Sequence, residues 1–593
     1  MADNMKGLKR THYCGEVVTA GETVTVGGYV DAVRNQGGLI FIVLRDRTGV
    51  VQLTFNETTA PEVFEKAASC HSEYVVMAKG EVRTRENINK KIPTGHVEIF
   101  VDDLRILAKA QTPPFEIVDN SNTNEELRLK YRYLDLRRRP LQQNIIMRSK
   151  IAKVARDYFY ENGFIEIETP MMIKSTPEGA RDYLVPSRVH QGSFYALPQS
   201  PQIYKQLLMI SGYDRYIQLA RCFRDEDLRA DRQPEFTQID LEMSFVETED
   251  VMEMAEGFIS RVFSEVLDRE IPVPLPRMTY TEAMERFGSD KPDTRFGMEI
   301  VDLSDTVKNC GFGVFTSAIE AGGTVRCITA KNSAGTFTRK EIDKLTEYVK
   351  GIGVKGLAYI RWSDEAPNCS FGKFLAEGEL DAILAKAGAE KGDVVFIIAD
   401  KKNTALSSLG SLRLRCAKQL GIIPEGQFNF LWITEFPFFE WNEDTQHWDA
   451  MHHPFTMPMD ECLQYLDTAP EKVFAKAYDL VLNGTELSSG SIRITDYELQ
   501  QKMFEALGLS DEEIQAKFGF LVDAYKYGAA PHGGMGIGLD RLAMIMCGAE
   551  SLRDVTAFPK VQNASELMSN CPAPVDKESL DILGISVNKT EEE

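Results

Sequence analysis

Cysteines and long apolar runs are both scarce in this chain of 593 residues, and each absence narrows the class of protein. The ten cysteines stand singly, without a Cys-x-x-Cys pair, which favours a reduced cytoplasmic protein over a zinc or disulfide scaffold. No apolar run is long enough to cross a bilayer, and the polar stretch 1–10 lacks the apolar core of a signal peptide. With 43% hydrophobic and 26% charged residues, the composition excludes wholesale disorder and indicates a globular protein with several domains.

A net positive charge is also missing, since the formal net charge is −22 at pH 7. The whole chain would therefore not suggest a nucleic-acid ligand. The first 110 residues nevertheless hold 14 basic and 14 acidic side chains, so the net negative charge lies downstream of them. A locally neutral module can still bind RNA, so local sequence features, not the net charge, must decide whether the chain binds nucleic acid.

Residues 24–108 carry the pattern of five short strands, at 24–30, 39–44, 50–55, 74–83 and 97–107, with a helical stretch at 61–69 after the third. This order predicts a five-stranded barrel of the oligonucleotide-binding (OB) type. In the second strand both faces are apolar, so one face lines the core and the other is left for Phe41. Periodicity alone favours a core position for Phe41, with a base-stacking platform as the alternative.

A linker with Pro113 and Pro114 follows the barrel, and it leads into the basic stretches 128–132 and 137–139. Two interpretations stay open for these: a solvated hinge, or a basic clamp on an RNA backbone. From Leu141 the apolar spacing becomes helical.

Residues 298–421 alternate strands and helices as a separate inserted domain, in which we find no catalytic constellation. Thr338 and Glu341 have the spacing of a capping box, which predicts the start of a helix.

Two motifs point to nucleotide chemistry. In the first, residues 215–242 predict an antiparallel hairpin with Arg224 at the end of its first strand, where a guanidinium suits a phosphate or carboxylate. In the second, alternating glycines at 533–538 allow close approach of a ligand to the backbone, and Arg541 stands one residue before the helical run 542–546. Either motif alone is weak, because glycine-rich strands are often bulges and buried arginines are often in ion pairs.

Together and in this order, the motifs resemble those of the class II aminoacyl-tRNA synthetases. Phe223–Glu226 with the following strand is similar to motif two, Gly534–Arg541 to motif three, and the segment ending at Gly163–Phe164 to motif one, which forms the dimer interface in that family. The barrel matches the anticodon-binding domain of the aspartate, asparagine and lysine subgroup. Within that subgroup the segments 176–183, 199–205, 223–236 and 450–455 and the insertion resemble bacterial-type aspartyl-tRNA synthetases.

The resemblance implies an α+β multidomain protein, for which we expect the following division: an OB-fold barrel at 1–111, a hinge at 112–141, an antiparallel-sheet catalytic domain at 142–290 and 422–560, the inserted α+β domain at 291–421, and a C-terminal extension at 561–593.

The implied reaction activates L-aspartate with ATP to aspartyl-adenylate and pyrophosphate, and then transfers aspartate to the 3′-terminal adenosine of tRNA(Asp). Neither step needs a protein nucleophile, so the site should supply positioning and charge neutralisation. The resemblance assigns catalysis to Arg224, on the α-phosphate, and to Arg541, on the γ-phosphate. It assigns Mg²⁺ to Asp479 and Glu486. The ATP-binding residues it implies are Arg224, Asp225, Glu226, Gln233, Glu486, Gly538, Leu539, Asp540 and Arg541.

Substrate choice is expected to depend on two cations, Lys205 and Arg493, which would pair with the side-chain carboxylate of aspartate. Asparagine would then leave both charges without an anion. The aspartate-binding residues implied by the resemblance are Glu178, Ser200, Gln202, Lys205, Arg224, Asp240, His452 and Arg493, with Glu178, Gln202 and Asp240 receiving the ammonium group. We expect Arg493→Leu to abolish aspartate activation while the fold survives. His452 and His453 have no Cys or His at zinc spacing, so we expect no zinc.

In the barrel, the resemblance makes Phe41 a platform for the central anticodon base, with Gln52, Glu98 and Arg34 reading base edges. Some relatives charge only tRNA(Asp) and others also tRNA(Asn), and a residue in the first hairpin helps to separate them. Gln36 stands at that position and matches neither kind, so both remain open, with strict specificity favoured.

Three other functions would use parts of the same pattern. An asparaginyl-tRNA synthetase would not be expected to keep both Lys205 and Arg493, nor to carry the insertion. An amide-forming ligase shares the adenylating core but has no use for the barrel, and a non-enzymatic RNA-binding paralogue would not need Arg224, Asp479, Glu486 and Arg541.

Overall fold

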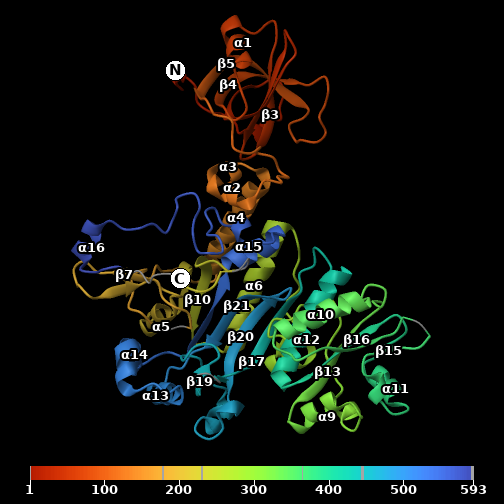
Figure 1. The fold of residues 1–593 in the computed structure, drawn as a ribbon. Coiled ribbons are helices and arrows are strands. Elements are labelled where there is room, and N and C mark those ends of the chain that lie inside the picture. The colour runs from red at the N-terminus through yellow and green to blue at the C-terminus, as the bar shows by residue number, and fades with distance from the viewer. Residues whose placement is uncertain (1, 177–178, 229–231, 364, 443–445, 589–593) are drawn as a thin grey trace. The chain divides into compact units, whose positions relative to one another are not determined.

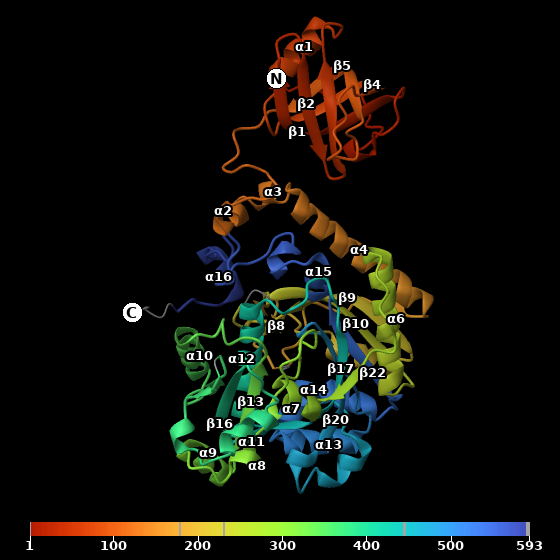
Figure 2. The ribbon, with the colours of Figure 1, turned by 90° about the vertical axis from the view of Figure 1, so that its right-hand side faces the viewer.

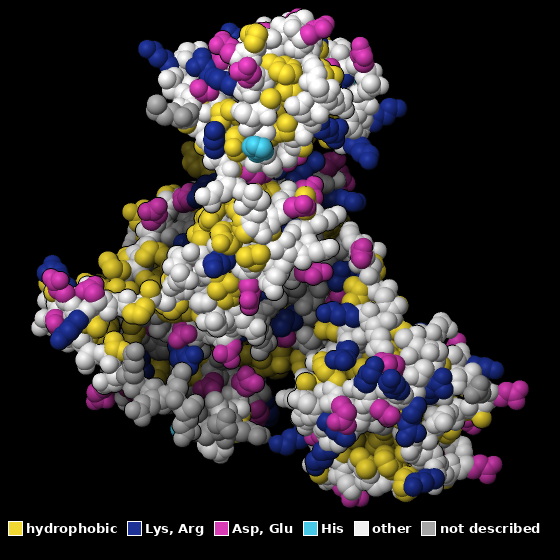
Figure 3. Space-filling model, turned by 45° about the horizontal axis from the view of Figure 1, so that its top comes forward, with side chains coloured by type: hydrophobic (Ala, Val, Ile, Leu, Met, Phe, Trp, Pro, Cys, Tyr) yellow, Lys and Arg dark blue, Asp and Glu magenta, His cyan; other side chains and the backbone are white. Residues whose placement is uncertain are grey.

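The computed structural model describes residues 2–176, 179–228, 232–363, 365–442 and 446–588. Two compact units make up the chain, each taken by itself below. Unit 1 comprises Met1–Ile146 with Arg553–Ala573, and unit 2 comprises Met147–Leu552 with Pro574–Glu593. Among the described residues no helix is both long and apolar enough to cross a membrane. On the face shown in Figure 3, basic and acidic side chains are interspersed and hydrophobic side chains form separate patches.

Unit 1 contains a closed barrel with the strand order β1-β2-β3-β5-β4 (Figure 1). Its elements are β1 (Thr23–Asn35), β2 (Ile40–Asp46), β3 (Gly49–Phe55), α1 (Pro61–Ala68), β4 (Val75–Thr84) and β5 (Val97–Ala108). In β2, Ile40, Ile42 and Leu44 are fully buried, whereas Phe41 and Val43 on the other face stay partly exposed. The strand pattern therefore predicted the OB barrel correctly, and Phe41 lies outside the core.

The basic stretches after the barrel form an internal cluster in unit 1, where the short helices are α2 (Glu125–Lys130) and α3 (Arg132–Asp135). Asp135 is fully buried, and its carboxylate accepts hydrogen bonds from Arg132 at 2.8 Å and Arg138 at 2.9 Å. Arg128 lies 3.5 Å from the same group. The interpretation as a solvated hinge was wrong for these three arginines, because they converge on one buried carboxylate. That carboxylate balances only one of the three positive charges, and the basic clamp on an RNA backbone stays a prediction.

Unit 2 is built on an eight-stranded sheet with the order β11-β17-β20-β21-β22-β10-β9-β6. The strands are β6 (Ile165–Glu166), β9 (Arg215–Phe223), β10 (Glu235–Ser244), β11 (Arg277–Thr279), β17 (Phe430–Pro437), β20 (Phe474–Leu482), β21 (Thr485–Ile492) and β22 (His532–Gly538). β9, β10, β22, β21 and β20 pair antiparallel with one another in that order, and they form the floor on which the site is built. A side chain at Gly534 would collide with the backbone of Leu241, so β22 can lie between β10 and β21 only with glycine there.

Helices flank this sheet (Figure 2). They are α4 (Arg139–Glu161), α5 (Gln202–Ile210), α6 (Thr248–Leu267), α7 (Tyr280–Phe287), α13 (Tyr497–Ala506), α14 (Asp511–Tyr525) and α15 (Leu539–Cys547). A further helix, α16 (Lys577–Leu583), lies away from the sheet (Figure 2). The end of α4 packs on α6, with the rings of Phe159 and Phe258 5.4 Å apart. Two small hairpins complete the set, β7 (Leu184–Pro186) with β8 (Phe194–Ala196) and β18 (Phe439–Asn442) with β19 (His447–Ala450).

The inserted segment has its own five-stranded sheet, in the order β12-β13-β16-β14-β15. Its elements are β12 (Val301–Asp302), α8 (Ser304–Val307), α9 (Gly313–Glu320), β13 (Thr324–Ala330), α10 (Arg339–Gly351), β14 (Ala358–Arg361), β15 (Asn368–Cys369), α11 (Glu379–Lys386), β16 (Val394–Asp400) and α12 (Lys402–Leu420). Helix α10 begins after Thr338 as the spacing predicted, but the Thr338 side chain makes no capping hydrogen bond there. Glu341 instead pairs with Lys344, so the capping-box prediction was right about the helix start and wrong about the bonds.

Candidate active site

A cavity of about 550 Å³ opens on the sheet of unit 2, over β10, β21 and β22. It brings together residues that are up to 352 positions apart in the sequence. Fourteen of the site residues predicted from the sequence line it: Ser200, Gln202, Lys205, Arg224, Glu226, Gln233, Asp240, His452, Asp479, Glu486, Arg493, Gly538, Asp540 and Arg541.

Three of the residues predicted for the catalytic site are not part of this lining. Glu178 lies outside the described residues. Asp225 turns to Arg181, whose guanidinium lies 3.4 Å from its carboxylate and whose carbonyl accepts its backbone N–H. Leu539 is buried at the start of α15. Asp540 lines the cavity, yet both of its carboxylate oxygens are engaged, one by Arg148 at 2.6 Å and the other by the backbone N–H of Thr237 at 2.6 Å.

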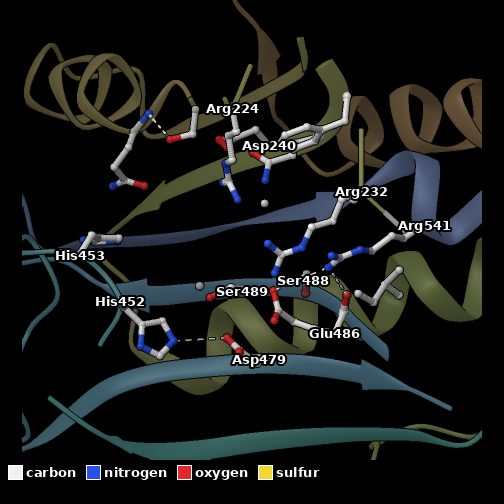
Figure 4. A pocket seen from close by; sticks show the side chains of 18 of the residues that line it. Arg224, Arg232, Asp240, His452, His453, Asp479, Glu486, Ser488, Ser489 and Arg541 are labelled. Carbon is white, nitrogen blue, oxygen red and sulfur yellow. Dashed lines mark hydrogen bonds and ion pairs between the residues drawn. The ribbon is translucent and has the colours of Figure 1, made fainter. Parts of the chain in front are cut away.

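Arg224 follows the last residue of β9 and points into the cavity (Figure 4). Its guanidinium lies 5.1 Å from the ring centroid of Phe236, which fixes the group by a cation–π contact. Its Nε is buried and has no hydrogen-bond partner among the described residues. A buried donor left open in this way is suited to an anionic ligand.

Arg541 lies in the first turn of α15, because the helix begins at Leu539 directly after the glycine strand. The sequence had placed Arg541 just before the helix, which was wrong by one turn. Its Nη1 donates to the backbone carbonyl of Glu486 at 2.8 Å. In Figure 4, Arg541 and Arg232 both point towards Glu486, and Arg232 forms an ion pair with Glu226 at 3.0 Å. The positive end of α15 adds to the field that these two guanidinium groups create.

Two carboxylates face the arginines from neighbouring strands, Asp479 on β20 and Glu486 on β21 (Figure 4). Nε2 of His452 lies 3.5 Å from Oδ1 of Asp479. Burial and the nearby charge of Asp479 raise the pKa of Glu486 above its ordinary value. Among the residues that the structure describes, no group of three or more His, Cys, Asp or Glu side chains is arranged to hold a metal ion.

At the other end of the cavity, four charged side chains form a buried quartet of Lys205, Asp240, Glu242 and Arg493, each no more than 3% exposed. Lys205 Nζ lies 2.9 Å from Asp240 and 3.3 Å from Glu242. Arg493 donates to both oxygens of Glu242, at 2.9 and 3.1 Å. The two cations and two carboxylates balance, so the quartet carries no formal net charge.

Glu242 was missed by the sequence reasoning, although it stands two residues after Asp240 in β10 and therefore on the same face of the strand. Burial alone would raise the pKa of Glu242, but Arg493 and Lys205 lower it to about 2. Burial raises the pKa of Asp240 to about 6, against the opposing effect of Lys205. The expectation that asparagine would leave two cations without any anion was thus too simple, since the protein itself supplies both counter-charges.

His453 adjoins the quartet, with its Nε2 2.7 Å from Nη1 of Arg493. Burial and the charge of Arg493 lower the pKa of His453 well below its ordinary value. The imidazole is therefore neutral and can accept a hydrogen bond from the guanidinium.

On the barrel of unit 1, the four predicted anticodon residues lie on adjacent strands. Arg34 on β1 pairs directly with Phe41 on β2. Gln52 on β3 donates to the carboxylate of Glu98 on β5 at 2.8 Å. The structure thus places a partly exposed ring beside an amide, a carboxylate and a guanidinium on the outer face of the barrel. Gln36 lies exposed in the turn between β1 and β2.

The family of class II tRNA synthetases (D, K and N) matches residues 124–562, and the OB-fold nucleic acid binding domain matches residues 24–107. The first match spans most of the chain, and it covers the cavity and its arginines. The chain belongs to the class II tRNA synthetases of the D, K and N group.

Among its relatives is "Aspartate--tRNA ligase" of Ruminiclostridium cellulolyticum, 58% identical over 99% of this chain and 100% of the relative. "Aspartate--tRNA(Asp/Asn) ligase" of Caldanaerobacter subterraneus subsp. tengcongensis is 55% identical over 99% and 100%. A solved structure of asparaginyl-tRNA synthetase from Pyrococcus horikoshii with asparaginyl-adenylate is 18% identical, with a TM-score of 0.58 over 93% of this chain and 98% of that chain. At that identity the likeness shows the fold alone.

Proposed function

We propose that this chain is an aspartate–tRNA ligase, which activates L-aspartate with ATP and transfers it to the terminal adenosine of tRNA(Asp). The observation that carries the proposal is the cavity itself. It joins an amino-acid end, where the buried quartet presents two fixed cations, to a nucleotide end with Arg224 and Arg541. The names of the full-length relatives agree with this assignment.

In this account, Lys205 and Arg493 bind the side-chain carboxylate of the substrate, while Glu242 holds both cations in position. The amide of Gln202 and the carboxylate of Asp240 receive the ammonium group. The Nε2 of Gln202 is buried without a hydrogen-bond partner among the described residues; as a donor it is available to a carboxylate oxygen of the substrate, while Oε1 is the atom that can accept from the ammonium group. Aspartate is preferred because its second carboxylate meets preorganised donors that an amide cannot match in charge.

At the nucleotide end, Arg224 neutralises the charge that develops on the α-phosphate when the substrate carboxylate attacks it. Arg541 holds the γ-phosphate at the positive end of α15. Asp540 acts differently from the ATP ligand that the resemblance implied. Its carboxylate ties Arg148 and the backbone of β10 to the start of α15, and so fixes Arg541 in place.

Asp479 and Glu486 fit a magnesium ion, because Mg²⁺ in nucleotide sites takes one or two protein carboxylates and completes its shell with phosphate oxygens and water. When bound, the ion supplies charge neutralisation at the leaving pyrophosphate. His452, 3.5 Å from Asp479, orients that carboxylate.

The barrel binds the anticodon, with Phe41 as the stacking platform and Arg34, Gln52 and Glu98 as readers of base edges. We further propose a homodimer through the motif-one segment, where Tyr160 at 80% and Ile165 at 48% exposure leave large apolar side chains uncovered.

The test is aminoacylation with radiolabelled aspartate and separate transcripts of tRNA(Asp) and tRNA(Asn). The proposal predicts charging of tRNA(Asp). No transfer of aspartate to either transcript, together with transfer of radiolabelled asparagine to tRNA(Asn) in a parallel assay, would overturn it. Because the relatives carry both names, the tRNA(Asn) arm decides between strict and relaxed specificity.

A further inference from the structure

The segment between α7 and β12 places a lysine beside Glu486, at the nucleotide end of the cavity. Asp290 on this segment is part of the cavity lining. The Nζ of the next residue, Lys291, lies 3.1 Å from Asp290 Oδ2 and 3.6 Å from Oε2 of Glu486. The ammonium therefore stands between two carboxylates, one of which we assign to the metal.

The same segment packs against the turn that joins β20 to β21, the two strands that carry Asp479 and Glu486. Gly484 in this turn has φ of +79°, and a Cβ there would lie only 3.0 Å from Cβ of Asp293. The position of Lys291 is thus coupled by direct packing to the hairpin that carries both carboxylates.

The inserted domain holds this segment in place through Arg413 of α12, which is 1% exposed. Its guanidinium donates to the backbone carbonyls of Asp293 at 2.9 Å and Phe296 at 2.7 Å and to that of Gly297. It also lies 4.0 Å from the ring centroid of Phe296. A side chain at Gly410, one turn earlier on α12, would collide with the carbonyl of Gly288, so the helix lies directly against the start of the segment.

We propose that Lys291 is a resident counter-cation of the metal site: its ammonium neutralises Glu486 and Asp290 while no metal–nucleotide is bound, and it competes with the incoming divalent ion. Arg413 is the positioning residue that keeps Lys291 there. The inserted domain thereby sets the metal affinity of the nucleotide site. This inference rests on the proposed function, because it takes Asp479 and Glu486 as the metal carboxylates.

The alternative is an ordinary surface ion pair, since the Lys291 side chain is 43% exposed. Lys344 provides the matched control: it is 57% exposed and pairs with Glu341 at 2.8 Å, on the far-removed helix α10. Loss of a surface pair of this kind changes little. The methionine variants of the two lysines therefore separate the two interpretations.

The experiment measures binding of Mn²⁺ to the full-length protein without nucleotide, from the paramagnetic resonance signal of the free ion. A unit charge about 4 Å from a divalent ion repels it strongly even in water, so K291M should bind Mn²⁺ at least about tenfold more tightly than the wild type. K344M should match the wild type. Equal affinity of K291M and the wild type, or weaker binding by K291M, would overturn the inference.

The role of Arg413 is tested by a double-mutant cycle with R413K, which keeps the charge but cannot reach three carbonyls. If Arg413 acts through Lys291, R413K tightens Mn²⁺ binding and adds nothing in the K291M background. Equal effects of R413K in both backgrounds would refute the positioning role. The variant D479N distinguishes an error in the metal assignment from an error in the role of Lys291. If it binds Mn²⁺ as the wild type does, the metal assignment itself fails, whereas loss of binding in D479N with an unchanged K291M refutes only the inference about Lys291.

Discussion

Replacing Arg493 by leucine removes one of the two cations that neutralise Glu242. Glu242 is fully buried and has a pKa of about 2, against an ordinary value of 4.5. That depression persists although burial opposes it, so the attraction of Arg493 and Lys205 outweighs the cost of burying the carboxylate. Removing one partner of a buried ion pair lowers the free energy of unfolding by about 3–5 kcal/mol in comparable cases. We therefore expect R493L to lose aspartate activation and also about 3 kcal/mol of unfolding free energy, which corrects the expectation from sequence that the fold survives unharmed.

The double variant R493L/E242L separates the two effects. It removes the stranded carboxylate together with its partner, so its stability in urea unfolding should recover towards that of the wild type. Its ATP–pyrophosphate exchange with aspartate should stay abolished, because the substrate carboxylate has lost Arg493. A single variant R493L as stable as the wild type, or a double variant no more stable than R493L, would refute the structural reasoning about the quartet.

Three further predictions concern other parts of the molecule. The pKa of Asp240 is raised from 3.8 to about 6 in the folded protein. Above pH 6 the carboxylate is ionised in both the folded and the unfolded state, and its ionisation lowers the free energy of unfolding. Below about pH 4 it is protonated in both states, and this destabilisation disappears. D240N should therefore be about 2–3 kcal/mol more stable than the wild type at pH 8 and equal to it near pH 4, as measured by urea unfolding; equal stability at both pH values would contradict this. Arg224 has a buried, unpartnered Nε, so R224Q should unfold like the wild type but lose about 100-fold or more in pyrophosphate-exchange kcat, and a lower melting temperature would instead indicate a structural role. F41A should weaken charging of tRNA(Asp) by about 1–3 kcal/mol in kcat/KM while leaving pyrophosphate exchange unchanged, and impaired exchange would count against a role confined to the barrel.

Local sequence patterns predicted much of the fold. The alternation in β2 separated Ile40 and Ile42 in the core from Phe41 outside it, because strand periodicity is a property of neighbouring residues. The hairpin whose first strand ends before Arg224 was also predicted from local sequence, whereas the segment before Arg541 was singled out by its alternating glycines. The sequence resemblance then indicated 14 of the 29 residues that line the cavity.

The charge partners could not be predicted in this way. Glu242 and Arg493 are 251 positions apart and meet only because β22 lies between β10 and β21. Likewise, the neighbouring sequence does not show that Asp135 is buried and that three arginines surround its carboxylate. A stretch predicted to be a solvated basic segment therefore forms an internal cluster. Long-range ion pairs depend on strand order, which the periodicity of a single segment does not contain.

The central claim is that the buried quartet selects an acidic amino acid for adenylation, and the kcat/KM ratio of aspartate to asparagine in ATP–pyrophosphate exchange without tRNA tests it most directly. The account predicts exchange with aspartate and a preference over asparagine of at least about 100-fold, since Lys205 and Arg493 offer only hydrogen-bond donors, which both oxygens of a carboxylate can accept and an amide NH₂ cannot. Comparable exchange with the two amino acids, or exchange with asparagine alone, would contradict it.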